Sequence, residues 1–289
     1  MPEFITDITT ILRQEPTFFI TLSVFLGLVV GSFLNVVIHR LPKMMEKEWA
    51  DNCLELQGKE IPSSEKYSLV APRSSCPQCG HKITALENIP VISYLLLKGK
   101  CKSCKTSISL RYPIIEVLTG ILIGLVSWKF GFSITTLAAW IFTLALIVLT
   151  FIDLDTQLLP DDITLPLLWL GLLFNQTLGF TDLKSAVFGA MLGYFILWSV
   201  YWIFKIITGK EGMGYGDFKL LAAIGAWFGW QLLPAVILLS SILGATIGIA
   251  LIVFGNKNRQ SAIPFGPFLA LGGIAALFFG QKLASFYLA

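Results

Sequence analysis

Long runs of uncharged, mostly apolar residues alternate with short polar segments along this chain. Four runs contain no charged residue: Thr17 to Ile38, Ile134 to Ile152, Ile163 to Phe180 and Ala186 to Phe204. A helix needs about 20 apolar residues to cross the hydrocarbon core of a bilayer. The pattern therefore predicts a transmembrane helix in each of these four runs.

Three further regions complete the pattern. Ile114 to Trp128 contains a single acid, Glu116, and Ile263 to Phe279 contains no charge. Leu220 to Phe254 is too long for one helix, and the turn residues from Gly229 to Pro234 divide it into two. The predicted fold class is an all-α polytopic membrane protein with about eight transmembrane helices.

Composition agrees with a membrane location. Of 289 residues, 55% are hydrophobic and 13% are charged, and the mean hydropathy is +0.76, which excludes an ordinary soluble domain. The first span is full length and follows an acidic segment, so we expect it to be an anchor rather than a signal peptide. The net charge of +3 gives no indication of a nucleic-acid partner, and none is expected.

One long polar segment, Arg40 to Tyr112, interrupts the apolar pattern and holds twelve of the 21 Lys and Arg residues. By the positive-inside rule this segment is cytoplasmic. Alternation then places three short polar loops on the same side, Asp153 to Asp162, Lys205 to Lys219 and Asn256 to Ser261. The predicted domains are residues 1–39 with the first helix, a cytoplasmic module at 40–112, and a seven-helix bundle at 113–289.

Two C-x-x-C pairs lie in the cytoplasmic segment. Cys76 and Cys79 form the first, Cys101 and Cys104 the second, and 21 residues separate them. Two such pairs complete a tetrahedral, all-cysteine zinc site with no open position for water, so a structural zinc in a ribbon-like insertion is predicted.

Incidental or redox-active cysteines are the alternative, although a redox site needs only one pair. Cys53 receives no role. His81 is interpreted as a surface histidine rather than a zinc ligand.

Acidic residues gather at two predicted helix ends. Asp153 directly follows the span ending at Ile152, and Asp217 follows Gly214-Tyr-Gly just before the span starting near Leu220. The topology places both carboxylates at the cytoplasmic edge of the bilayer. Ionisable residues there are costly and indicate function.

Two carboxylates within hydrogen-bonding reach share a proton, so one serves as general base on a water while the other stays protonated. This is the arrangement of an aspartic protease, with Asp153 and Asp217 as the catalytic pair. Asp155 is a less favoured substitute for Asp153. Helix capping is the alternative for each acid and the preferred interpretation of Asp162.

A set of motifs spans nearly the whole chain in a fixed order. These are Gly31-Ser-Phe-Leu-Asn-Val-Val-Ile-His-Arg-Leu-Pro42, the cysteine pairs, Arg111-Tyr-Pro113 with Glu116, Ile152-Asp153 leading into Leu158-Leu-Pro-Asp161, Gly214-Tyr-Gly-Asp217 and Pro264-Phe-Gly-Pro267. The set resembles the bifunctional type IV prepilin peptidases, also called prepilin leader peptidase/N-methyltransferases.

The resemblance implies that the protein cuts the leader from type IV prepilins and type II secretion pseudopilins at the inner membrane. It also implies methylation of the new N-terminal residue with S-adenosylmethionine, for which no Gly-rich nucleotide loop is present. Asp153 and Asp217 match the family's catalytic acids, and the four cysteines of the pairs match those of its cytoplasmic domain. Glu116 is expected to hydrogen-bond in the bundle or to position Arg111.

Two other classes of function are open at this point. A proton-coupled transporter also uses membrane acids, but it predicts acids near the midplane and inverted repeats. A membrane-anchored zinc-ribbon adaptor leaves the paired acids unexplained. The sequence does not indicate which pilins are substrates, where S-adenosylmethionine binds or the oligomeric state.

Overall fold

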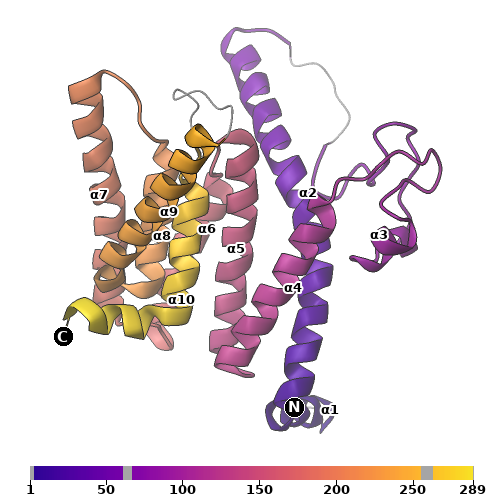
Figure 1. The fold of residues 1–289 in the computed structure, drawn as a ribbon, viewed down its shortest axis with the longest axis horizontal. Coiled ribbons are helices and arrows are strands. Elements are labelled where there is room, and N and C mark those ends of the chain that lie inside the picture. The colour runs from indigo at the N-terminus through magenta and orange to yellow at the C-terminus, as the bar shows by residue number, and fades with distance from the viewer. Residues whose placement is uncertain (1–2, 61–66, 255–262, 289) are drawn as a thin grey trace. The chain divides into compact units, whose positions relative to one another are not determined.

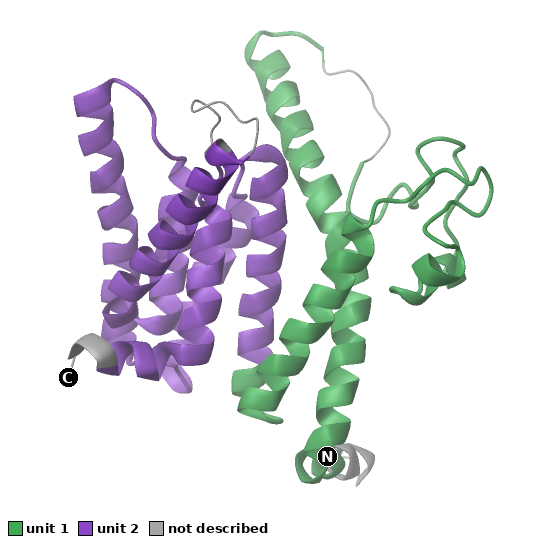
Figure 2. Cartoon of the chain, in the orientation of Figure 1, with its two compact units in different colours: residues 1–136 green, residues 137–289 purple. Residues whose placement is uncertain are grey.

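The computed structural model describes residues 3–60, 67–254 and 263–288. It divides into two compact units, residues 1–136 and 137–289 (Figure 2). The predicted loop Asn256 to Ser261 lies outside the described residues. The helices of the first unit are α1 (Glu3–Gln14), α2 (Pro16–Leu56), η1 (Leu86–Asn88), α3 (Ile92–Leu96) and α4 (Arg111–Phe130). Those of the second are α5 (Ile134–Thr156), α6 (Asp161–Thr177), α7 (Leu183–Thr208), α8 (Tyr215–Phe228), η2 (Trp230–Leu232), α9 (Leu233–Val253) and α10 (Gly266–Leu288).

In unit 1, α2 and α4 lie side by side (Figure 1). Each carries two glycines four residues apart on the shared face, Gly27 and Gly31 on α2 and Gly120 and Gly124 on α4. A Cβ built on Gly27 would lie 2.9 Å from Cα of Gly120. Helix association in lipid depends on such close packing because apolar burial supplies little driving force there.

In unit 2, α8 is the central helix. Every residue from Asp217 to Phe228 except Lys219 is buried, and α6, α7, α9 and α10 contact the helix. Gly189 of α7 meets Gly225 of α8 backbone to backbone. At the other face, the Trp227 indole donates a 2.8 Å hydrogen bond to the Leu167 carbonyl of α6.

Six helices within the described residues are long and apolar enough to span a membrane: α2, α4, α5, α7, the α9 region and α10. The predicted count of eight is not confirmed. The helices α6 and α8 form where expected but have 17 and 14 residues. At about 1.5 Å per residue, α8 is about 21 Å long, whereas the hydrocarbon core is about 30 Å thick. The turn predicted between Gly229 and Pro234 separates α8 from α9.

The compact units divide the chain differently from the predicted domain ranges, because α4 packs against α2 and so belongs with the cysteine module.

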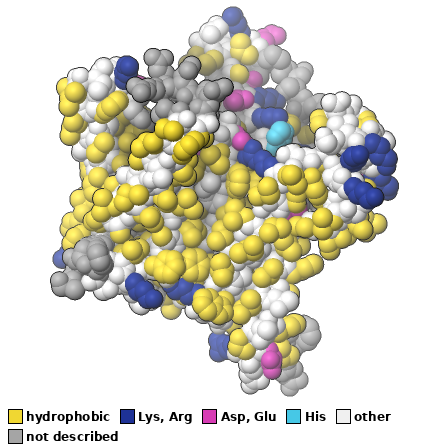
Figure 3. Space-filling model, in the orientation of Figure 1, with side chains coloured by type: hydrophobic (Ala, Val, Ile, Leu, Met, Phe, Trp, Pro, Cys, Tyr) yellow, Lys and Arg dark blue, Asp and Glu magenta, His cyan; other side chains and the backbone are white. Residues whose placement is uncertain are grey.

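Hydrophobic side chains cover the outward faces of the helices (Figure 3). Lys and Arg side chains gather over the cysteine module, where Lys98, Lys100, Lys102 and Lys105 are all exposed. Apolar helix faces of this kind are what lipid requires.

Candidate active site and metal site

Asp153 lies in the last turn of α5, because the helix continues to Thr156 beyond the predicted end at Ile152. The residue is 4% exposed, and its Oδ2 accepts a 2.9 Å hydrogen bond from the backbone N–H of Gly266. Gly266 is the first residue of α10, so the carboxylate meets the positive end of that helix dipole. The contact offsets part of the cost of burying an acid.

Asp217 lies in the first turn of α8 and is 6% exposed. Its Oδ2 accepts a 3.3 Å hydrogen bond from the N–H of Gly214, which is the capping role considered above. Its Oδ1 is buried, with no hydrogen-bond partner in the described part of the chain. A buried acceptor left unpaired costs about 1–3 kcal/mol, so capping alone does not explain this side chain.

The two acids lie at one end of unit 2, on either side of Leu159. A Cβ built on Gly216, next to Asp217, would lie 2.7 Å from Cβ of Leu159. A Cβ built on Gly266 would lie 3.2 Å from Leu159 Cδ1 and 2.6 Å from Oδ2 of Asp153. The two carboxylates are also within electrostatic range of each other. The structure thus brings together the predicted pair, and glycine is required at both positions that adjoin it.

The neighbouring acids have different surroundings. Asp155 is exposed. Asp161, also exposed, receives both of its 2.7 Å hydrogen bonds from Nζ of Lys219 on α8. The prediction that Asp162 caps α6 is wrong, since Pro160 occupies the cap position and no side chain there makes a capping hydrogen bond. Neither the Lys219 contact nor the role of Gly266 was foreseen, although Pro264-Phe-Gly-Pro267 was noticed as a motif.

The cysteine pairs sit on two equivalent knuckles. In the first, Cys76 N–H donates to the His81 carbonyl and Gly80 N–H to the Cys76 carbonyl, both at 2.9 Å. In the second, Cys101 makes the corresponding bonds with Thr106 and Lys105 at 2.8 and 3.1 Å. Gly80 and Lys105 both have positive φ, 70° and 61°. Each knuckle is therefore a tight turn that presents two thiols.

The four thiols fit a tetrahedral metal ion. Sγ of Cys76 lies 3.7 Å from that of Cys104, and Sγ of Cys79 lies 3.9 Å from that of Cys101. All four are within 4.8 Å of one another. Zinc–sulfur bonds of about 2.3 Å in a tetrahedron place sulfur atoms about 3.8 Å apart. A disulfide needs about 2.05 Å.

The thiols also influence one another's ionisation. Hydrogen bonds from Thr106 lower the pKa of Cys104 to about 6, and backbone N–H groups of Cys79 and Gln78 lower the pKa of Cys76. For Cys79 a backbone hydrogen bond from His81 also acts downward, but burial and the other cysteines raise the pKa to about 11. Four thiolates this close together repel one another. A divalent cation bound between them offsets that repulsion and allows all four thiols to lose their protons.

His81 is outside this cluster. Its Nε2 lies 3.1 Å from Oε2 of Glu87, and Lys102 lies 3.4 Å from Oε1. The Thr84 backbone N–H, together with His81 and Lys102, lowers the pKa of Glu87 to about 2. His81 therefore pairs with Glu87. This pairing agrees with the interpretation that His81 is not a zinc ligand. Cys53 is an exposed cysteine on α2.

Polar groups of the Gly31 to Pro42 motif attach the loops to the helices. Asn35 donates 3.2 Å hydrogen bonds to the carbonyls of Gly31 and Tyr112. Arg40, buried at 8% exposure, donates to the carbonyls of Ser68 and Pro72 at 2.9 and 2.7 Å.

Comparison with known proteins gives a consistent result across the chain. The model of the bacterial peptidase A24 N-terminal domain matches residues 25–130, and that of the type IV leader peptidase family matches residues 140–249. A prepilin leader peptidase/N-methyltransferase of Aeromonas salmonicida is 54% identical over 276 residues, covering 94% of this chain and 95% of its own. This chain belongs to the prepilin leader peptidase/N-methyltransferase family.

Other relatives carry the same name. The protein of Pseudomonas aeruginosa is 52% identical over 278 residues, with 96% of both chains covered, and that of Burkholderia pseudomallei is 48% identical over 269 residues, with 92% and 86% covered. No solved structure matches the chain. The resemblance drawn from the motifs is confirmed, and nothing in these findings supports the transporter alternative.

Proposed function

We propose that this protein is a membrane aspartic endopeptidase that removes the leader peptide of prepilins and then N-methylates the new N-terminal residue. Family membership supports both activities. The observation that carries the peptidase assignment is the pair of buried carboxylates at one end of unit 2. One of them has an oxygen with no hydrogen-bond partner among the described residues. Asp153 and Asp217 are the proposed catalytic residues.

In the proposed cleavage, one carboxylate of the pair is ionised and the other is protonated. The ionised member takes a proton from a water molecule as that water attacks the scissile carbonyl. The protonated member donates a hydrogen bond to the carbonyl oxygen, and a proton then passes to the leaving amine. The Gly266 N–H holds Oδ2 of Asp153 and so fixes the plane of that carboxylate.

We propose that the cysteine cluster holds zinc in a structural role. Cys76, Cys79, Cys101 and Cys104 would be the ligands, and four thiolates leave no position for substrate. Between residues 67 and 110 only Gly99 and Cys101 are buried, so this segment has almost no apolar core. Such a segment needs a metal cross-link to hold its shape.

For the second activity we propose S-adenosylmethionine as the methyl donor. The protein is a multi-pass inner-membrane protein, and the proposed active site faces the cytoplasm. Prepilins and type II secretion pseudopilins are the proposed substrates, in contact with membrane lipid. A basic leader followed by an apolar helix has its cleavage point at that interface.

Incubation of purified protein with a full-length prepilin and S-adenosylmethionine tests the proposal. Mass spectrometry should show removal of the leader and one added methyl group on the new N-terminal amine. An intact prepilin after incubation with folded, metal-loaded protein would reject the peptidase. Leader removal without methylation would reject only the transferase.

A further inference from the structure

The cysteine module carries a group of exposed apolar side chains on η1 and α3, two short helices that contact each other. The exposed residues are Leu86 at 77%, Ile89 at 36%, Ile92 at 53%, Leu95 at 67% and Leu96 at 77%. These five residues are called the α3 patch below. Single exposed apolar residues are ordinary, but five of them on two adjoining short helices indicate an interaction surface.

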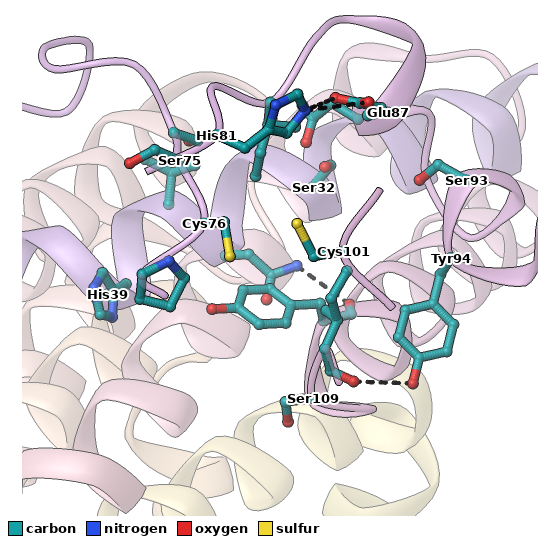
Figure 4. A pocket seen from close by; sticks show the side chains of 18 of the residues that line it. Ser32, His39, Ser75, Cys76, His81, Glu87, Ser93, Tyr94, Cys101 and Ser109 are labelled. Carbon is teal, nitrogen blue, oxygen red and sulfur yellow. Dashed lines mark hydrogen bonds and ion pairs between the residues drawn. The ribbon is translucent and has the colours of Figure 1, made fainter. Parts of the chain in front are cut away.

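The helix α3 has two different faces. Its three patch residues follow the i, i+3, i+4 spacing of one helix face. On the other face, Ser93 and Tyr94 line a pocket of about 600 Å³ (Figure 4). The Tyr94 hydroxyl donates a 3.1 Å hydrogen bond to the Ile108 carbonyl, which attaches this face to the second knuckle. The inner face of α3 is therefore held by protein, and the apolar face points outward.

Hydrogen bonds fix the position of α3 along the long helices of unit 1. Val91, directly before α3, donates its N–H to Oε2 of Glu116 on α4 at 2.8 Å, and Glu116 also contacts the Ser32 side chain of α2. Glu116 lies about 7.5 Å along α4 from its first residue, Arg111, and Ser32 lies about 9 Å before Ile38, where the first predicted span ends. Both helices are long and apolar enough to cross a membrane. The start of α3 therefore lies beside the spanning helices and not beyond their ends (Figure 1).

The turn that leads into α3 is enforced by this contact. Val91 has φ of 61°, a left-handed conformation that a β-branched residue rarely adopts. Such a conformation persists only where the surrounding structure holds it. The hydrogen bond to Glu116 holds the Val91 N–H, so the direction of α3 is fixed by α4.

Basic side chains border the α3 patch. Residues 67–110 contain six Lys and Arg residues and one acid, Glu87. In the turn that ends α3, the Lys98 N–H donates a 3.1 Å hydrogen bond to the Leu95 carbonyl. The side chains of Lys98 and Lys100 are exposed, and Figure 3 shows Lys and Arg side chains of this module next to hydrophobic ones. Apolar side chains bordered by lysines are typical of segments that lie in the interface of an anionic membrane.

We propose that the α3 patch inserts into the cytoplasmic leaflet of the membrane, and that Lys98 and Lys100 contact the anionic lipid headgroups there. A lipid surface fits the exposed apolar face, its position beside the spanning helices and the positive charge at its border. The cysteine module is then docked on the membrane and is not free in the cytoplasm. The proposal goes beyond the two enzymatic activities and depends on neither of them.

A spin label tests the apolar contact in full-length protein reconstituted into nanodiscs that contain phosphatidylglycerol. The label is attached to Leu96→Cys in a Cys53→Ser background after loading with zinc, and mass spectrometry shows that only position 96 is labelled. Relaxation of the label by oxygen, which partitions into lipid, is compared with relaxation by a water-soluble nickel complex.

The control is a label on Cys53 of the unmutated protein. Cys53 is exposed on α2, fifteen residues beyond the end of the predicted span at Ile38. We expect the ratio of oxygen to nickel accessibility to be about tenfold higher at position 96 than at Cys53, because oxygen is apolar and the nickel complex is excluded from hydrocarbon. Prepilin cleavage and zinc content show that the labelled variant is folded.

Amide hydrogen exchange in residues 86–97 tests the headgroup contact. Exchange should be slower by about fivefold or more in nanodiscs with phosphatidylglycerol than in nanodiscs of phosphatidylcholine alone, because each lysine near an anionic surface contributes about 1 kcal/mol, or about fivefold. The double variant Lys98→Gln/Lys100→Gln should reduce this difference to below about twofold. Lys59→Gln/Lys210→Gln removes the same charge from exposed positions outside the module and should retain the full difference.

Three results would overturn the proposal. A label at position 96 that is as open to the nickel complex as the label on Cys53 would place the patch in water. A label shielded from both reagents would mean that protein covers the patch, for example a second copy of the chain. Equal exchange in the two kinds of nanodisc, or an equal effect of the two double variants, would exclude the headgroup contact.

Discussion

The two units hold their functional side chains in opposite ways. In unit 2, the acids are carried by packed helices, and every residue of α8 from Asp217 to Phe228 except Lys219 is buried. In unit 1, the four cysteines of the cluster are carried by short loops in which almost every residue is at least partly exposed. Helix packing positions one set of groups, and a proposed metal ion positions the other.

This difference implies that the two sites are separable. A change at the acids should leave the loops intact, and loss of the metal should leave the bundle intact. The following changes test that separation.

The largest effect is expected from Asp153→Asn or Asp217→Asn. Each should lower the rate of leader cleavage by about a thousandfold or more, because a catalytic pair fails when either member is neutralised. Methylation of a pre-cleaved pilin should stay near the unmutated rate, which a coupled peptide-cleavage and methyl-incorporation assay measures. Asp155→Asn is the matched control and should cleave normally. Substantial cleavage by either pair variant would remove that residue from the proposed mechanism.

Removal of the metal should have the next largest effect, confined to unit 1. Chelation or Cys76→Ser should raise amide hydrogen exchange in residues 67–110 by more than about tenfold, since this segment loses its proposed cross-link. Cleavage should change by less than about threefold. Cys53→Ser is the control, because Cys53 lies on α2 outside the cluster. A similar rise in exchange in unit 2, or a large loss of leader cleavage, would show that the units depend on each other.

A smaller, specific effect is expected for Gly266→Ala. The added Cβ would lie 2.6 Å from Oδ2 of Asp153, so either the carboxylate or α10 must shift. We expect cleavage to fall by about tenfold with little change in zinc content, since a small misplacement of a reacting group is costly. Gly248→Ala on α9 is the control, because among the described residues its Cβ would meet only the flexible tip of Ile263. Full activity in Gly266→Ala would mean that this contact does not orient Asp153.

The smallest effect is expected for Lys219→Gln, which breaks the ion pair with Asp161. The two side chains are 28% and 53% exposed, and exposed pairs contribute about 0–1 kcal/mol. Thermal unfolding of Lys219→Gln, Asp161→Asn and the double variant should show coupling below about 1 kcal/mol. A larger coupling would indicate that this pair also holds α8 and Asp217 in place.

Much of this arrangement could be predicted from the sequence. Hydropathy located the apolar part of each long helix, although α2 continues to Leu56 beyond the predicted span, and the cysteine spacing correctly grouped Cys76, Cys79, Cys101 and Cys104. The proximity of Asp153 and Asp217 also followed from their places at predicted helix ends. These features depend on local patterns or on topology, both of which a linear sequence records.

Other features depend on three-dimensional packing. A helix buried in protein is as apolar as one in lipid, so hydropathy could not show that α8 is only 14 residues long. The Gly266 contact joins residues 113 positions apart and has no sequence signal beyond an unexplained motif.

The short length of α8 determines how water can reach the acids. Asp217 is at the first turn of this helix, and at the opposite end Trp227 and Phe228 stack with Phe142, Phe174 and Phe180. These aromatic rings fill the bundle at the end of α8 away from Asp217, so we expect the attacking water to reach the proposed catalytic acids from the Asp217 end of the helix.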